Sequence, residues 1–230
     1  MTTARQIERI FAPLIKRNEG LVVSSAGFIW LTPVHHVACR VLIERSSDAD
    51  ICWPQWALLH TFIPGWNLSI SIGERGQLQR PASSKERFWR WSDPSMIDDA
   101  VSVIETEALP LLHSMRKLEA FADLFEDGDY RRRREWPVDR MIFEIALGNL
   151  DAARAIWHGL APDNRENRHP DSDSFQQTRN KILAVADPLL AGDRAALATI
   201  LHGWEAANIR GTKIEPYWEP TPFPLETAPG

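Results

Sequence analysis

The sequence has few cysteines and no long apolar run. Its two cysteines, Cys39 and Cys52, show no metal-ligand spacing, and we expect two free, buried thiols in a reducing compartment. A disulfide is geometrically possible if their strands are neighbours. No apolar segment approaches the ~20 residues of a membrane span, and none follows the first residues as a signal peptide would. These absences predict a soluble, cytoplasmic protein.

Motifs that would identify an enzyme are also missing. The chain contains no Gly-rich phosphate loop, nucleophile elbow, HExxH motif or paired-cysteine motif. This lowers the odds of an enzyme and leaves catalysis an open question. We expect no cofactor and no metal. The formal net charge of -5 argues against a protein built mainly to neutralise phosphates.

Tryptophan, in contrast, is abundant, with ten residues in a chain of 230. An indole buries a large area and needs only one donor satisfied, so most of the ten are expected in or beside the core. The alternative is an aromatic-lined pocket or interface that uses several of them.

Alternating apolar and polar residues predict an antiparallel sheet in the first third of the chain. In the run 34–45, alternate residues from Val37 to Ile43 are apolar, and the run 67–72 alternates in the same way. Residues 21–24 and 28–32 are typical of a hairpin. The short connections favour a meander of about four strands. Prolines 54 and 64 predict that 53–63 is an edge strand or partly irregular.

Helical spacing of apolar residues predicts helices on both sides of this sheet segment. The first runs from Thr2 or Thr3, which can cap it, to Gly20, which suits a left-handed end. From Ser83 to Glu126 the period is helical again, with a kink or break expected beside Pro110. The first part of the chain is therefore predicted to be an α+β domain, with helices packed on the sheet.

The second half shows an internal repeat with an offset of 44 residues. Residues 146–159 align without gaps on 190–203, with a glycine followed by Asn149 or Asp193 as a helix cap. This predicts an all-α helical-hairpin region after the sheet domain. The predicted domains are an α+β sheet domain (1–126), a charged linker (127–136), a helical-hairpin repeat region (137–210) and a Pro-rich tail (211–230) that runs extended over the surface or frays.

Several segments together resemble a bacterial family of domains of unknown function. They are the opening helix ending in Leu14-Ile15-Lys16, the hairpin reaching Phe28-Ile29-Trp30, the strand 36–44 followed by Asn67-Leu68-Ser69-Ile70, and Leu109-Pro110-Leu111-Leu112. The similarity is one of pattern and covers roughly residues 4–126. Some members occur beside toxin systems as candidate immunity proteins, so the resemblance implies a helix–sheet–helix fold and such a role. It supplies no catalytic motif. The repeat half is similar in style to tetratricopeptide-like hairpins.

A first set of candidate site residues lies on the expected wet face of the sheet. A small-molecule binder or an enzyme would use a ligand-binding set of His36, Arg40, Glu44 and His60. Of the adjacent pair His35-His36, one ring is expected to be buried and one exposed, because neighbouring strand residues point to opposite faces.

A second set lies in the aromatic and basic segments that follow the sheet. Arg131 to Arg134 is the one basic cluster, and with flanking aromatics it could grip phosphates and stack a base. The acidic residues 126–129 can neutralise it, so nucleic acid is the less favoured ligand. The candidate partner-binding residues are Trp89, Trp91, Arg131, Arg132, Arg133, Arg134 and Trp136.

The leading hypothesis is a non-enzymatic bacterial cytoplasmic protein that binds another protein, in an immunity or adaptor role. It follows from the resemblance, the repeat, the aromatics and the missing catalytic signature. The alternatives are a small-molecule binder or enzyme, and nucleic-acid binding through 131–134. The sequence does not indicate an oligomeric state.

Overall fold

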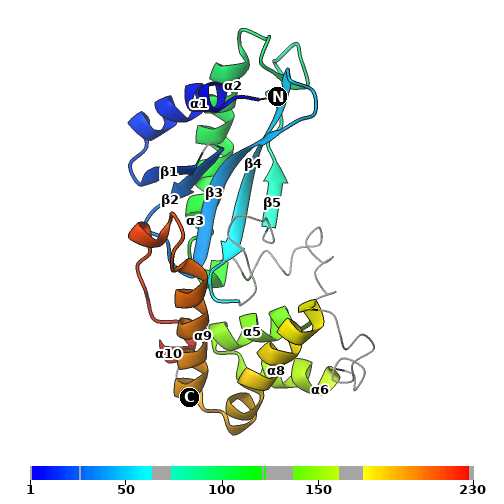
Figure 1. Ribbon diagram of the computed structural model, residues 1–230, viewed down its shortest axis with the longest axis vertical. Coiled ribbons are helices and arrows are strands. Elements are labelled where there is room, and N and C mark those ends of the chain that lie inside the picture. The colour runs from blue at the N-terminus through cyan, green and yellow to red at the C-terminus, as the bar shows by residue number, and fades with distance from the viewer. Residues whose placement is uncertain are drawn as a thin grey trace. The chain divides into compact units, whose positions relative to one another are not determined.

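The computed structural model describes residues 2–25, 27–63, 74–120, 122, 137–160 and 173–227. They form an α+β protein with an antiparallel sheet and helices (Figure 1). The chain divides into two compact units. The first comprises Met1–His60, Leu68–Lys117 and Gly211–Glu219, and the second comprises Thr61–Asn67, Leu118–Arg210 and Pro220–Gly230.

Helix α1 (Ala4–Arg17) opens the first unit as its sequence pattern predicts. The Thr3 hydroxyl accepts a hydrogen bond from the Gln6 backbone N–H, and the Gln6 side chain accepts one from the Thr3 N–H, which completes a capping box. Its apolar stripe is buried, and Gly20 has a positive φ of 77° where the chain turns into the sheet. The residues of the stripe are Ile7, Ile10, Phe11 and Leu14.

The sheet has six strands among the described residues, where the sequence predicted about four. In chain order they are β1 (Leu21–Ser25), β2 (Phe28–Leu31), β3 (Val37–Arg45), β4 (Ile51–His60), β5 (Glu74–Gln77) and β6 (Trp89–Arg90). The first five follow one another across the sheet, and β6 pairs with β4 beyond the end of β5. The antiparallel hairpin of β1 and β2 is confirmed. The predicted strand 67–72 lies outside the described residues.

Strand β4 is an interior strand, so of the two alternatives expected for 53–63 the edge strand is wrong, and the segment is irregular only after His60. The strand pairs with β3 on one side and with β5 and β6 on the other. Pro54 lacks an N–H, and on β4 this group would point away from β3. On that side β5 pairs with Gln55–Leu58 and β6 pairs with Ile51–Cys52, so Pro54 falls in the gap between them and no ladder hydrogen bond is lost. There the Pro54 carbonyl accepts a hydrogen bond from the Leu78 N–H, at 2.9 Å. A proline in a sheet needs such a gap in the ladder.

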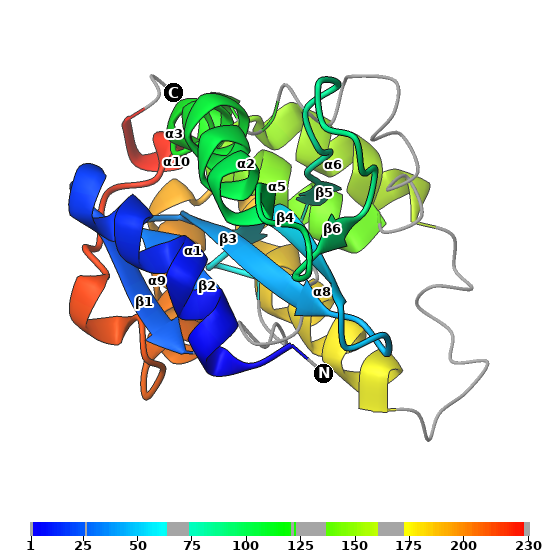
Figure 2. The ribbon, with the colours of Figure 1, turned by 90° about the horizontal axis from the view of Figure 1, so that it is seen from above.

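One face of the sheet is covered by a long, interrupted helix. It consists of α2 (Met96–Val103), the π-helical turn η1 (Ile104–Ala108) and α3 (Leu109–Ser114), which run along the sheet in both views (Figures 1 and 2). The interruption lies beside Pro110, where a break was predicted, since proline cannot donate the hydrogen bond that continues an α-helix. α1 packs on α2 and β1, and α3 packs on β3. Cys39 and Cys52, which share this face, are buried and free.

The chain returns to the first unit near its C-terminus. The 3-10 turn η3 (Glu215–Tyr217) precedes a short parallel bridge between Val34 and Trp218. The Val34 N–H donates to the Tyr217 carbonyl at 2.8 Å, and the Glu219 N–H donates to the Val34 carbonyl at 3.0 Å. Residues 211–219 are therefore held to the segment between β2 and β3.

The second unit is helical. Helix α5 (Pro137–Leu147) packs on α6 (Leu150–Gly159), and α8 (Asp173–Ala191) packs on α9 (Arg194–Ile209). Gly148 and Gly192 separate the members of each pair, both with a positive φ. The Asp193 carboxylate caps α9 through the Ala196 N–H, as predicted, whereas the Asn149 side chain donates to Glu144 and makes no such cap. That the two pairs form a repeat stays a prediction.

The last described residues pack into the second unit, contrary to the expectation that the Pro-rich tail runs over the surface. Helix α10 (Pro224–Thr227) lies on α5 and α9, and Phe223 and Leu225 are fully buried. The Phe223 ring meets that of Phe62 edge-on, with 5.4 Å between centroids. The tail is thus part of the core, because two of its apolar side chains fill space between helices.

Candidate functional site

The sheet face opposite α2 and α3 carries Arg40, one of the predicted ligand-binding residues. Its side chain is only 1% exposed. The guanidinium carbon lies 4.6 Å from the centroid of the Phe28 ring and 5.1 Å from that of Trp30, both on neighbouring strand β2. Burial lowers the pKa of Arg40 to about 10, so the group remains charged at neutral pH. Cation–π contacts with the two rings stabilise that buried charge.

The other predicted ligand-binding residues do not converge on Arg40. Glu44 shares its face of β3 but is exposed, and it accepts a hydrogen bond from the Gln55 amide. His60 is buried and stands opposite Val37 in the ladder, so its side chain points to the other face of the sheet. His36 is buried just before β3 begins, and His35 is partly exposed.

The predicted partner-binding tryptophans of the segment 85–91 point inward. Trp89 is 2% exposed, and its indole N–H donates to the Leu78 carbonyl at 2.9 Å. The Trp91 indole N–H donates to the Thr2 hydroxyl at 3.0 Å. The structure therefore places Trp89 in the core of the first unit. The remaining predicted partner residues, 131–134 and Trp136, lie outside the described residues.

The same segment presents Phe88 outward. Because side chains alternate along a strand, the burial of Trp89 turns its neighbours Phe88 and Arg90 to the opposite side. Phe88 is 47% exposed and contacts Trp53 of β4 edge-on, with ring centroids 6.1 Å apart. The Arg90 guanidinium carbon lies 5.8 Å from the Phe88 centroid. We call Trp53, Phe88 and Arg90 the aromatic patch. Sequence reasoning missed this patch, because helical spacing was expected from Ser83, whereas the structure has strand β6 at Trp89–Arg90 and the next helix begins only at Met96.

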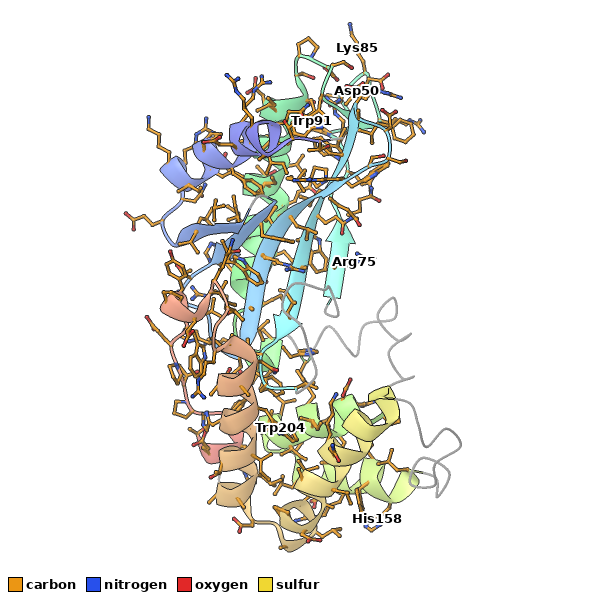
Figure 3. All side chains as sticks on the ribbon, viewed as in Figure 1. Asp50, Arg75, Lys85, Trp91, His158 and Trp204 are labelled. Atoms are coloured by element: carbon orange, nitrogen blue, oxygen red, sulfur yellow. The ribbon has the colours of Figure 1, made fainter. Side chains whose placement is uncertain are left out.

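Carboxylates beside the patch hold Arg90 in place. Arg90 Nη1 lies 3.5 Å from an Asp50 oxygen, and Arg90 Nε lies 3.2 Å from Glu86. The Ser92 hydroxyl and N–H donate to Asp50, and together with Arg90 they lower the pKa of its carboxyl. Figure 3 shows Asp50, Lys85 and Trp91 together at one end of the sheet.

Two exposed cations flank Phe88 without a partner among the described residues. Lys85 and Arg87 are both exposed, and neither forms an ion pair with any described residue. The surface around Phe88 therefore combines an exposed ring, a fixed guanidinium and two available positive charges. Such a surface can contact an apolar group bordered by carboxylates.

A buried arginine anchors the segment that carries the patch. The Arg80 side chain is 1% exposed, and it forms ion pairs with Asp93, at 2.5 Å, and with Asp99. Hydrogen bonding from Arg80 lowers the pKa of Asp93. Burial opposes ionisation of Asp99, but hydrogen bonds from Arg80, Ser84 and Ser95 outweigh it and lower that pKa too. Arg80 also donates to the Phe88 carbonyl, at 3.4 Å.

The second unit contains a row of acidic and imidazole groups. His202 of α9 lies between Glu205, 4.0 Å from its Nδ1, and Glu226 of α10, 2.9 Å from its Nε2. The Thr61 hydroxyl donates to Glu205 at 2.5 Å, and both residues are fully buried. His202 and Glu226 are about one-third exposed, whereas Glu205 and Thr61 have no contact with solvent. The row fastens the segments at 61 and 226 to α9.

Neither a metal centre nor a membrane-spanning helix is found in the part of the chain that the structure describes. No three His, Cys, Asp or Glu side chains of those residues gather closely enough to hold an ion. None of the helices there combines the length and apolar character needed to cross a bilayer.

Comparison with known proteins gave no relative, since no family model, no curated protein and no solved structure matches the chain.

Proposed function

We propose that this protein binds another protein through the aromatic patch, in an adaptor or immunity role in the bacterial cytoplasm. The single observation that carries the proposal is the exposure of Phe88, 47%, on a rigidly held surface with Trp53 and Arg90. Binding hot spots are enriched in aromatic residues and arginine, and they need a surface that is ordered before the partner arrives. The missing catalytic motifs and the pattern resemblance support the same choice.

The partner is inferred to present an apolar pocket bordered by carboxylates. Phe88 is the residue that enters the pocket. Lys85 and Arg87 lie beside it as exposed cations, and carboxylates on the partner would meet both charges. Since Asp50 and Glu86 already neutralise the charge of Arg90, the Arg90 side chain contributes a contact surface in a fixed position and no uncompensated charge.

The helical pairs of the second unit support an adaptor role. We infer that α5–α6 and α8–α9 are repeated helical hairpins of the kind that form protein-binding scaffolds, each turning at a glycine of positive φ. This inference is independent of the aromatic patch, because it concerns a different unit of the chain.

A photocrosslinking amino acid at position 88 tests the proposal. Benzoylphenylalanine replaces Phe88 in the full chain, which is expressed in the source cells and irradiated. The matched control carries the same residue at Tyr217, an aromatic site that is 38% exposed and lies in neither proposed interface. The proposal predicts one protein crosslinked from position 88 and not from position 217, with the yield reduced by Lys85→Glu plus Arg87→Glu.

Crosslinking with equal yield from both positions, or no protein crosslinked from position 88, would contradict the proposal. A nucleic-acid adduct would support the alternative ligand. A partner recovered from position 88 whose yield does not change when the two charges are reversed would overturn the inferred carboxylate border.

A further inference from the structure

The outer strand of the sheet, β1, has main-chain groups that point away from β2. The Thr32 N–H donates to the Gly20 carbonyl at 2.7 Å, which makes residues 20 and 32 a hydrogen-bonded pair of the β1–β2 ladder. In an antiparallel pair such residues alternate with residues whose N–H and C=O point outward. Gly20 and Val22 therefore face β2, and Leu21 and Val23 face outward. No described strand pairs with this edge.

The outer edge also lacks the charges that usually protect a strand from pairing. β1 reads Leu21-Val22-Val23-Ser24-Ser25, without a charged residue or proline. Among the described strands, β5 lies at the opposite edge, and it carries Arg75. Charged side chains and prolines on edge strands prevent association with other chains, so β1 is open to pairing and β5 is protected.

Exposed apolar side chains accompany the open edge. Val23 is 45% exposed on the helix-bearing side of the sheet, since it pairs with Ile29. On α1, Arg17 contacts Glu105 of η1, and Ile15 points about 160° away from Arg17 around the helix. Ile15, 39% exposed, thus lies on the flank of α1 that faces away from η1. A strand that pairs with β1 would cover the exposed side chain of Val23.

We propose that two copies of this chain associate by antiparallel pairing of their β1 strands. A two-fold axis at Val22 places Leu21 of one copy opposite Val23 of the other, and both residues have outward-pointing main-chain groups. A second copy brings the same uncharged strand, the same spacing and the same apolar flank, so the contact is self-complementary. This interface goes beyond the function proposed above and uses the edge of the sheet away from the aromatic patch.

The register gives a sharp test by disulfide formation. Val22 would stand opposite its own copy in a non-hydrogen-bonded pair, with Cα atoms about 4.5 Å apart, which a disulfide can bridge. The full chain with Val22→Cys is predicted to form a covalent dimer under mild oxidation. Native Cys39 and Cys52 do not compete, because both are buried and burial raises the pKa of each thiol to about 12. Leu183→Cys, at a site 59% exposed on α8, is the control and should remain largely uncrosslinked.

Sedimentation of the chain without added cysteines provides the second measurement. The wild-type protein should dimerise, and Val23→Lys, which places like charges at the interface, should weaken dimerisation at least tenfold with an unchanged circular dichroism spectrum. A wild-type chain that stays monomeric, or a Val22→Cys dimer no more abundant than that of Leu183→Cys, would overturn the proposal. So would a disulfide that joins the Val22→Cys variant to a different protein in place of a second copy.

Discussion

At the scale of single residues, Arg80 determines whether the segment carrying the aromatic patch stays in place. Its guanidinium has almost no contact with solvent and meets two carboxylates that are themselves partly exposed. A buried charge of this kind contributes little to stability relative to an apolar core, yet removing one partner is costly because the remaining charges lose their counter-ion. Phe88 depends on this arrangement through its carbonyl, to which Arg80 donates.

Replacing Arg80 with methionine is predicted to destabilise the protein by about 2–3 kcal/mol at pH 7. The native pKa values of Asp93 and Asp99 lie below the ordinary value of 3.8, so their contribution is fully present above that value and is lost as the pH falls from there through the lowered native pKa values. Thermal melting from pH 7 to pH 3 should show a steep fall in Tm for the wild type and a shallower one for Arg80→Met.

The control for this prediction is Lys85→Met, at an exposed cation that pairs with no described residue, which should change stability by no more than about 0.5 kcal/mol. Parallel pH profiles for the wild type and Arg80→Met would show that the two aspartates owe their low pKa values to something other than Arg80.

At the scale of elements, the sheet holds strand β5 by a contact that requires glycine. Gly76 stands opposite Trp56, and a Cβ atom at position 76 would lie 2.4 Å from atoms of the Trp56 indole. Trp56 is buried, so its ring has little room to move aside. Gly203, in the middle of α9, has nothing within 4 Å of the same position.

Opposite effects are therefore predicted for the same substitution at these two glycines. Gly76→Ala should destabilise the protein by about 1–3 kcal/mol, because the indole must shift. Gly203→Ala should stabilise it by about 0.5–1 kcal/mol, because alanine favours the helix and meets no neighbour. Urea unfolding of both variants measures the difference, and a destabilising Gly203→Ala or a neutral Gly76→Ala would contradict the packing described.

The spacing of neighbouring residues in the sequence was enough to predict some of the secondary-structure elements. The cap at Thr3, the stripe of α1, the hairpin β1–β2 and the break beside Pro110 each depend on a few neighbouring residues. The interior position of β4 could not be predicted, because Pro54 is acceptable only where β5 ends and β6 begins, and that depends on pairing with residues 20 to 40 positions away. Phe88 was missed for the same reason, since nothing local indicates which of two adjacent aromatic residues enters the core.

At the scale of the whole molecule, the chain does not finish one unit before it begins the next. Residues 211–219 pair with the first unit beside Val34, and residues 220–227 pack into the second unit. Phe223 is the central contact in the second unit, where its ring lies 5.4 Å from that of Phe62 and 4.8 Å from the His202 imidazole. Residues 211–219 thus contribute to the first unit, and residues 220–227 contribute buried side chains to the core of the second.

Phe223→Ala is predicted to cost about 3–4 kcal/mol, the usual effect of removing a buried ring. Leu183→Ala, at a site 59% exposed, should change stability by less than about 0.5 kcal/mol. Differential scanning calorimetry of the two variants provides the comparison. A Phe223→Ala protein as stable as Leu183→Ala would show that the tail is dispensable to the second unit.

The most direct test of the central claim is the affinity of the purified chain for the protein captured at position 88. Isothermal titration with the Phe88→Ala variant should show binding at least tenfold weaker than that of the wild type, because the exposed ring supplies the main contact. Tyr217→Ala, at a site 38% exposed outside both proposed interfaces, should bind as the wild type does. Equal affinity for wild type and Phe88→Ala would contradict the assignment of the aromatic patch as the binding surface.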